Sequence, residues 1–173
     1  MSDDASRVGE VFIEGDHATI VFKRVLRHRP ELVWDAITNP TELAGWLMCS
    51  SARIDGRVGG TVAMVAGPAQ FHVSGKVLTW DPPRVFAHEW KVAPVPPMPQ
   101  GEDAVFRYEL TPEGDHTLLT VEYRRMTRNT AAGFAPGTHV LLDRLEAQLG
   151  KQAMPSWMPR FEELRALYPQ WKK

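Results

Sequence analysis

Two prolines bracket the sequence PELVWDAITNP at positions 30–40. Proline is favoured in the first turn of a helix, and Glu31 suits the positive end of the helix dipole. Apolar residues then recur along one side, so a short helix is predicted over residues 31–37. Asparagine and the second proline end this helix, and Thr41 is predicted to cap a second short helix that runs to about Leu47.

Strands are predicted on both sides of this pair of helices. Residues 17–27 are rich in β-branched and apolar side chains, which predicts one strand before the helices. After the helices, short strand-like runs alternate with tight-turn signals such as Asp55-Gly56. These runs cover residues 51–54, 61–65, 71–80, 84–92, 104–110 and 116–125. Short strands joined by tight turns indicate an antiparallel meander.

The last third of the chain is predicted to be helical. Residues 137–149 carry one apolar stripe at helical spacing, and Gly150 is a good stop signal. A further amphipathic helix is predicted over residues 155–171, because aromatic residues recur there at alternating spacings of 4 and 3. This second stripe consists of Trp157, Phe161, Leu164, Tyr168 and Trp171.

Together these elements predict an α+β fold. A curved antiparallel sheet of about six to seven strands wraps around a long C-terminal helix, and two short helices follow the first strand. We expect a single domain over residues 1–173, with a frayed end at 1–9, the sheet-and-helix core at 10–150 and an additional helix at 155–171. A curved sheet is not filled by one helix, so a cavity between the sheet and the long helix is expected.

Three groups of residues resemble a known family. The first is the stretch 30–40 followed by Leu43 and Trp46-Leu47. The second consists of Gly75-Lys76-Val77, Asp81-Pro82-Pro83-Arg84 and Trp90. The third is the late helix over 137–149. In this order and spacing they resemble the SRPBCC superfamily over roughly residues 15–150, most closely the branch named after activators of heat-shock-chaperone ATPase. The resemblance implies the helix-grip, START-like fold.

The resemblance also implies a class of function. Members of this superfamily mostly bind apolar small molecules in a cavity under the long helix, and some are cyclases or hydrolases. The chain departs from the family pattern in two places. Gly137-Thr138 stands where the family often has Gly-Trp, and the aromatic segment that begins at Pro155 extends beyond the usual end of the fold.

Composition argues against several other classes of protein. The 173 residues include 20 Lys+Arg and 21 Asp+Glu, a net charge of −1, so the basic excess typical of nucleic-acid or membrane-surface binding is absent. Cys49 is the sole cysteine, and neither metal-ligand spacing nor a cofactor fingerprint occurs, so no metal and no cofactor are expected. A polar N-terminus and the lack of a long apolar run predict a cytoplasmic protein without a membrane segment.

Strand parity predicts which side chains face the cavity. Alternate residues of a strand share one face, so Phe86, His88 and Trp90 are expected to point inward together. A cavity with apolar walls and a few converging polar groups is typical of a small-molecule site. The predicted ligand-binding residues are Trp46, Phe86, His88, Trp90, Phe106, Tyr108, Val121, Tyr123 and Leu142.

Four residues are candidates for catalysis, namely His88, Tyr108, Tyr123 and His139. An imidazole can donate, accept or transfer a proton near neutral pH. If His139 faced the same cavity as His88, the two could form an acid–base pair. The alternative for His88 is a core histidine that is bonded to a neighbouring group.

Three functions remain open at this point. The first is binding of an apolar or aromatic small molecule without chemistry. The second is a cyclase- or hydrolase-type enzyme that uses a cavity His/Tyr acid–base pair. The third, suggested only by the family's name, is a chaperone-associated regulator. The aromatic tail likewise has two interpretations, because it either packs on its own domain or forms a homodimer through Trp157, Phe161, Tyr168 and Trp171.

Overall fold

One antiparallel sheet of eight strands organises the part of the chain that the structure, a computed structural model, describes, residues 4–168. The strands are β1 (Glu10–Glu14), β2 (His17–Leu26), β3 (Ser51–Ile54), β4 (Thr61–Ala66), β5 (Phe71–Asp81), β6 (Val85–Val92), β7 (Glu102–Glu113) and β8 (His116–Thr127). Their order across the sheet is β1-β2-β8-β7-β6-β5-β4-β3. The predicted meander from β3 to β8 is confirmed, whereas β1 is an additional strand that the sequence did not predict.

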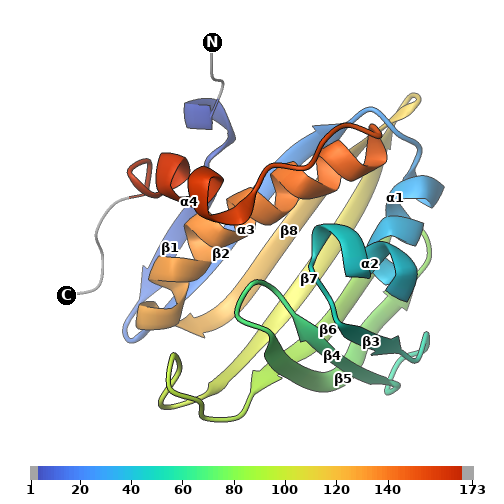
Figure 1. The fold of residues 1–173 in the computed structure, drawn as a ribbon. Coiled ribbons are helices and arrows are strands. Elements are labelled where there is room, and N and C mark those ends of the chain that lie inside the picture. The colour runs from blue at the N-terminus through green and yellow to red at the C-terminus, as the bar shows by residue number, and fades with distance from the viewer. Residues whose placement is uncertain (1–3, 169–173) are drawn as a thin grey trace.

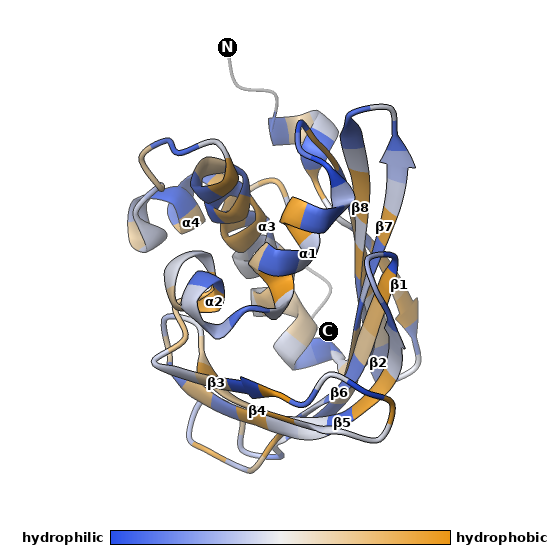
Figure 2. Ribbon diagram, turned by 90° about the vertical axis from the view of Figure 1, so that its right-hand side faces the viewer, coloured by the Kyte–Doolittle hydropathy of each residue, from blue (hydrophilic) through white to orange (hydrophobic). Residues whose placement is uncertain are grey.

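Between residues 4 and 168, four α-helices and one short 3-10 helix accompany the sheet. They are the 3-10 helix Asp4–Arg7, α1 (Pro30–Thr38), α2 (Pro40–Trp46), α3 (Arg128–Leu149) and α4 (Trp157–Arg165). Figure 1 shows α3 lying across the sheet, with α1 and α2 beyond one of its ends. In the view of Figure 2 the sheet curves around these three helices. The arrangement confirms the predicted α+β, helix-grip architecture. None of the helices between residues 4 and 168 is long and apolar enough to cross a membrane.

The two short helices begin and end where their prolines indicate. Pro30 occupies the first turn of α1, and Pro40 the first turn of α2. The cap of α2 is Asn39, whose side chain accepts a hydrogen bond from the backbone N–H of Thr41 at 3.0 Å. The prediction that Thr41 itself caps the helix was therefore wrong by two residues. Asparagine is as good a cap as threonine, and the proline that follows it fixes the start of the helix.

Helix α3 begins at Arg128, nine residues before the predicted start at 137. The first part of the helix contains Gly133 and Pro136, both poor helix formers, which hid it from the sequence pattern. Burial stabilises it instead, because Ala131 and Ala135 are completely buried against the rest of the core. The small side chains let the helix lie close to the concave face of the sheet.

The two ends of the described chain contact each other beside α3. Residues 1–9 were expected to be frayed, but Asp4–Arg7 form a 3-10 helix whose Asp4 pairs with Arg160 of α4 at 2.6 Å. The predicted C-terminal helix is shorter than residues 155–171, since α4 ends at Arg165. Tyr168 beyond it is 5% exposed, and Trp171 lies outside the described residues.

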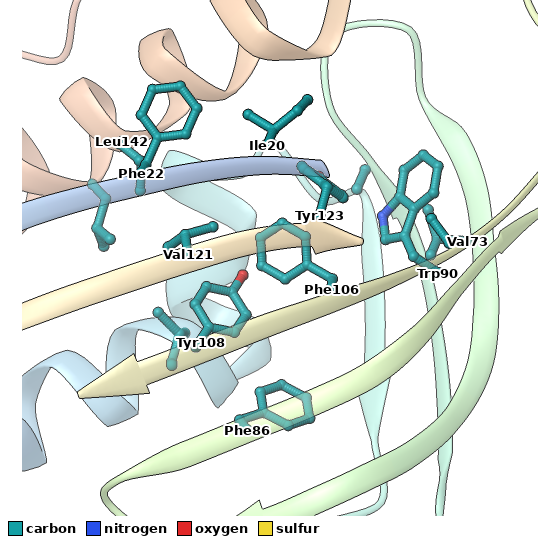
Figure 3. Packing of buried hydrophobic residues seen from close by; sticks show 14 of the residues in the cluster. Ile20, Phe22, Val73, Phe86, Trp90, Phe106, Tyr108, Val121, Tyr123 and Leu142 are labelled. Carbon is teal, nitrogen blue, oxygen red and sulfur yellow. The ribbon is translucent and has the colours of Figure 1, made fainter. Parts of the chain in front are cut away.

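Inward-facing aromatic residues of the sheet form much of the core. Figure 3 shows Phe86, Phe106, Tyr108 and Tyr123 projecting from neighbouring strands toward the same side. Directly paired positions place these rings next to one another, as in the pair of Phe86 with Tyr108 and the pair of Phe106 with Tyr123. Full burial of a large apolar side chain contributes roughly 1.5–3 kcal/mol, so this layer stabilises the sheet and also builds a rigid wall.

Candidate functional site

A cavity of about 700 Å³ lies between the curved sheet and α3. Its volume is within the usual range for small-molecule sites, roughly 300–1,000 Å³. The inner wall is formed by Phe86, His88, Trp90, Phe106, Tyr108 and Tyr123 of strands β6 to β8. Helix α3 supplies Phe134, Thr138 and Leu141, and further apolar wall residues are Ile37, Leu43, Leu47, Met64, Phe71 and Met98. The wall is therefore mainly aromatic and aliphatic.

Contacts between rings hold the aromatic wall in place. Phe106 is central, since its ring centroid lies 4.5 Å from that of Tyr108 and 4.3 Å from that of Tyr123. Phe86 stacks on Tyr108 at 5.9 Å with an interplanar angle of 11°. On the opposite side, Phe134 of α3 meets Trp90 edge-on at 5.1 Å. Such pairs add to the burial energy and leave little freedom for the wall to rearrange.

His88 is a polar group in the middle of this wall. It is 3% exposed, and its Nδ1 lies 2.8 Å from the backbone carbonyl oxygen of Glu89. A carbonyl oxygen can only accept, so Nδ1 carries the hydrogen and Nε2 keeps a lone pair. Burial lowers the pKa of His88 to about 4, although the hydrogen bond to Glu89 opposes this effect. The imidazole is therefore neutral at pH 7.

Two tyrosine hydroxyls are the other polar groups of the inner wall. Burial raises the pKa of Tyr108 well above its ordinary value. Burial also raises the pKa of Tyr123, against the effect of a hydrogen bond with the side chain of Thr138. Both hydroxyls therefore remain protonated at neutral pH and can donate or accept a hydrogen bond. Cys49 is likewise neutral, because burial raises the pKa of its thiol to about 11.

Charged and polar residues lie around the cavity near the start of α3. Asp16, Gln100, Thr127, Arg128 and Asn129 line this part. The backbone N–H and the hydroxyl of Thr127 both donate to the carboxylate of Glu102, at 3.1 and 2.9 Å. A carboxylate of the chain itself thus already occupies the positive end of the α3 dipole.

Helix α4 contributes one residue to the cavity. Trp157 lines it beside Gly137 of α3. A Cβ atom at position 137 would lie 3.3 Å from the Trp157 ring, so the glycine allows the indole to approach closely. Phe161 then stacks on Trp157 at 5.7 Å. The C-terminal segment is in this way part of the cavity wall.

A comparison with models of known protein families shows to which family this chain belongs. The model described as "Activator of Hsp90 ATPase homolog 1-like protein" matches residues 27–150, which is more than half of the chain. The chain belongs to this family. The SRPBCC resemblance expected from the sequence is thereby confirmed. In this member of the Hsp90-ATPase-activator-like family, the matched segment holds α1 to α3 and β3 to β8, and α4 lies outside it.

Solved structures show the same fold. CalU16 from Micromonospora echinospora is 24% identical with a TM-score of 0.66, over 93% of this chain and 96% of that chain. MLL2253 from Mesorhizobium loti is 24% identical with a TM-score of 0.67, over 78% and 98%. The protein encoded by BPP1335 from Bordetella parapertussis is 21% identical with a TM-score of 0.68, over 96% and 93%. None of the curated proteins compared with the chain matches it.

Six of the nine predicted ligand-binding residues line the cavity in this member of the family, namely Phe86, His88, Trp90, Phe106, Tyr108 and Tyr123. The other three are buried elsewhere. The indole N–H of Trp46 donates to the backbone carbonyl of Ala36 at 2.8 Å, which directs the ring into the packing between α1 and α2. Val121 pairs with Phe22 and is covered by the core. Leu142 is also in the core, because one residue turns a helix by about 100° and Leu141 faces the cavity instead.

His139 does not face the cavity either. It lies on another side of α3, where Nδ1 is 2.8 Å from the hydroxyl of Tyr168 and Nε2 is 4.0 Å from Asp143. Burial, followed by the nearby charge of Arg24, lowers its pKa to about 4. The sequence-based idea of a pair between His88 and His139 was wrong, because the two side chains belong to different parts of the interior.

Several wall residues were not predicted. Met64 and Phe71 face the cavity from β4 and β5, and strand parity alone could have identified them. Phe134 was missed because the helix was expected to begin after it. Met98 lies in the proline-rich loop, where no periodicity indicates the direction of a side chain. Between residues 4 and 168 no cluster of His, Cys, Asp or Glu is arranged to hold a metal ion.

Proposed function

We propose that this protein binds a neutral aromatic or apolar small molecule between the sheet and α3. The observation that carries the proposal is the cavity of about 700 Å³ with its aromatic inner wall. Pockets of this size and composition bury most of the surface of a small ligand. Membership of the family also supports this proposal, because the SRPBCC superfamily that the chain resembles suggests ligand binding or a cyclase-like function.

The ligand is expected to be neutral where it contacts the inner wall, because that wall offers no counter-charge, whereas the charged residues Asp16 and Arg128 line the cavity near the start of α3. The polar side chains there are His88, Tyr108 and Tyr123, and burial keeps all three uncharged at pH 7. A carboxylate or ammonium group placed against this wall would lose its hydration without gaining an ionic partner, at a cost of several kcal/mol. A ligand that is mainly apolar and carries one or two hydrogen-bonding groups matches the wall better.

Tryptophan fluorescence provides the test. Trp90 and Trp157 line the cavity, whereas Trp80 packs on Trp34 and Phe86 and does not line it. Titration with 1-methylnaphthalene is expected to change the emission in a saturable way. Replacing Trp90 by phenylalanine should remove much of the change, and the matched variant Trp80→Phe should keep it.

Thermal unfolding gives an independent measure of the same binding. At a ligand concentration of 100 times Kd the expected stabilisation is about 2.7 kcal/mol, which raises Tm by roughly 5–10 °C for a chain of this size. The proposal fails if a panel of neutral aromatic and aliphatic compounds produces neither a saturable emission change nor a rise in Tm.

An acid–base enzyme of the cyclase or hydrolase type is the second candidate, and the geometry favours it less. Its supporting observation is the lone pair of His88 Nε2 in a wall that also holds two tyrosine hydroxyls. A pKa of about 4 makes this nitrogen a weak base at neutral pH, where general bases work best with a pKa near the operating pH. Within residues 4–168, neither Tyr108 nor Tyr123 is hydrogen-bonded to His88.

Two further expectations concern partners. Association with a chaperone is suggested by the name of the family, and a pull-down with purified Hsp90 would test it. A homodimer through the aromatic tail is the other, and sedimentation velocity would test it. Within the chain, Leu164 and Tyr168 of this tail are already buried against the rest of the protein, which favours packing on its own domain.

A further inference from the structure

Resting on the binding function proposed above, we infer that His88 determines which hydrogen-bonding group the ligand must carry. The cavity selects a neutral molecule that presents an O–H or N–H donor to Nε2 of His88, as a hydroxylated aromatic compound does. A molecule of the same shape that lacks a donor at this position binds less tightly.

The first step of the argument is the tautomer of His88. The hydrogen of the neutral ring must be on Nδ1, because the atom facing it at 2.8 Å is the carbonyl oxygen of Glu89, which has no hydrogen to donate. Nε2 is then an acceptor and nothing else. The burial that keeps the ring neutral also keeps this lone pair available at pH 7.

The second step is the direction of Nε2. His88 lies on the inner face of β6, and its Nδ1 is held by the backbone of its own strand. Nε2 is the ring nitrogen farther from the backbone, so it points away from the strand and toward the space that the residue lines. The ring cannot turn easily, because Phe86 and Phe106 lie next to it with centroids at 5.1 and 5.8 Å. Among residues 4–168 no group hydrogen-bonds to Nε2.

The third step is that the other polar groups of the inner wall do not discriminate between a ligand that donates a hydrogen bond and one that accepts it. The hydroxyls of Tyr108 and Tyr123 rotate and can each donate or accept. The lone pair of His88 cannot adapt in this way, and a ligand that displaces water from it without supplying a hydrogen leaves an unsatisfied buried acceptor. The expected penalty corresponds to an affinity lower by about tenfold.

Two probes of similar shape test the inference. 1-Naphthol carries a hydroxyl where 1-methylnaphthalene carries a methyl group, and both are neutral at pH 7. Equilibrium dialysis gives Kd for each probe with the wild type, with His88→Phe and with His72→Phe. His72 is exposed on β5 and serves as the matched control. For each protein, the ratio of the two Kd values gives its preference for 1-naphthol over 1-methylnaphthalene. The two probes differ in solubility, but this difference is the same for all three proteins and cancels when their ratios are compared.

The inference predicts that the preference for 1-naphthol falls about tenfold in His88→Phe and stays unchanged in His72→Phe. An equal preference in all three proteins overturns it, while binding of both probes upholds the proposed function. If neither probe binds the wild type, this inference fails, and the panel of neutral compounds described above decides separately whether the proposed function fails as well.

Nitrogen NMR of the wild type tests the inference without any variant, so a folding defect in His88→Phe does not block the answer. Correlation of the imidazole nitrogens with the ring protons should show a protonated Nδ1 and an unprotonated Nε2. Addition of 1-naphthol should shift the Nε2 resonance in the direction of hydrogen-bond acceptance, and 1-methylnaphthalene should not. A proton on Nε2 in the free protein would overturn the inference whatever the probes do.

Discussion

Replacing Asp143 by alanine removes the main counter-charge of a buried arginine. The Arg24 side chain is 2% exposed, and its Nη1 donates to Asp143 Oδ1 at 2.9 Å. Burial lowers the pKa of Arg24, and the charge of Asp143 opposes that effect. Glu146 stays in place 3.5 Å from the same nitrogen. Loss of one partner of a buried ion pair costs roughly 3–5 kcal/mol of unfolding free energy. Because the carboxylate of Glu146 remains, we expect a loss at the lower end of this range, about 3 kcal/mol.

Urea unfolding followed by circular dichroism measures this loss. The matched control is Glu122→Ala, which removes an exposed pair with Arg124 at 2.6 Å and should cost less than about 1 kcal/mol. In the double variant Arg24→Met/Asp143→Ala the unpaired charge is gone, so part of the lost stability should return. If Asp143→Ala is no more destabilising than Glu122→Ala, the reasoning about a buried charge network is refuted.

Three further changes have defined outcomes. Tyr168→Phe deletes a hydroxyl that accepts from the backbone N–H of Gly9 at 3.0 Å and lies 2.8 Å from His139 Nδ1, so urea unfolding should show a loss of about 1–3 kcal/mol. A loss below about 0.5 kcal/mol would contradict the packing of this segment on its own domain. The free energy of unfolding should also decrease as the pH is lowered, because the pKa of His88 is about 4 in the folded chain and 6.5 ordinarily. The unfolded chain therefore takes up the proton at a higher pH than the folded chain, and about 3 kcal/mol is lost as the pH falls from about 6.5 to about 4. Denaturation curves at a series of pH values give the free energy of unfolding as a function of pH. This plot should be flatter for His88→Phe than for the wild type between about pH 6.5 and about pH 4. Equal slopes for the two proteins would contradict the low pKa assigned to His88. Gly133 lines the cavity on α3, and nothing lies within 4 Å of a Cβ placed there. Gly133→Ala should raise Tm by roughly 2–4 °C without affecting the affinity for 1-methylnaphthalene, whereas Gly133→Leu should weaken binding without lowering Tm; unchanged binding in the leucine variant would argue against the cavity as the site.

The sequence was most informative where local chemistry decides the structure. The prolines at positions 30 and 40 fix the starts of α1 and α2, since proline has a preset backbone angle and lacks the N–H that a first turn does not use. Parity along β6 and β7 correctly placed Phe86, His88 and Tyr108 on the inner wall, because alternation in a strand leaves no other choice once one face is buried.

Tertiary packing decided what the sequence could not predict. The start of α3 contains glycine and proline, and it is helical because burial of Ala131 outweighs local propensity. The side of α3 on which His139 lies depends on how the helix is rotated about its axis above the sheet. An error in the predicted start of the helix therefore changes the side on which His139 is expected. Trp46 is held by a carbonyl ten residues away, a contact that no spacing rule indicates.

The C-terminal segment shows the same limit on a larger scale. Its aromatic stripe was compatible both with packing on the domain and with a dimer. In the structure Trp157 reaches the cavity beside Gly137, and Tyr168 reaches His139 and Gly9. These contacts join residues far apart in the sequence, so only the folded chain reveals them.

The central claim is that the space between the sheet and α3 holds a neutral aromatic ligand. A crystal structure of the protein soaked with 1-bromonaphthalene tests it most directly, because the anomalous signal of bromine marks the position of the probe. We predict an anomalous peak inside the cavity, in contact with Phe106, Tyr108 and Phe134. Peaks confined to the outer surface, or an interior in which side chains fill this space, would contradict the claim.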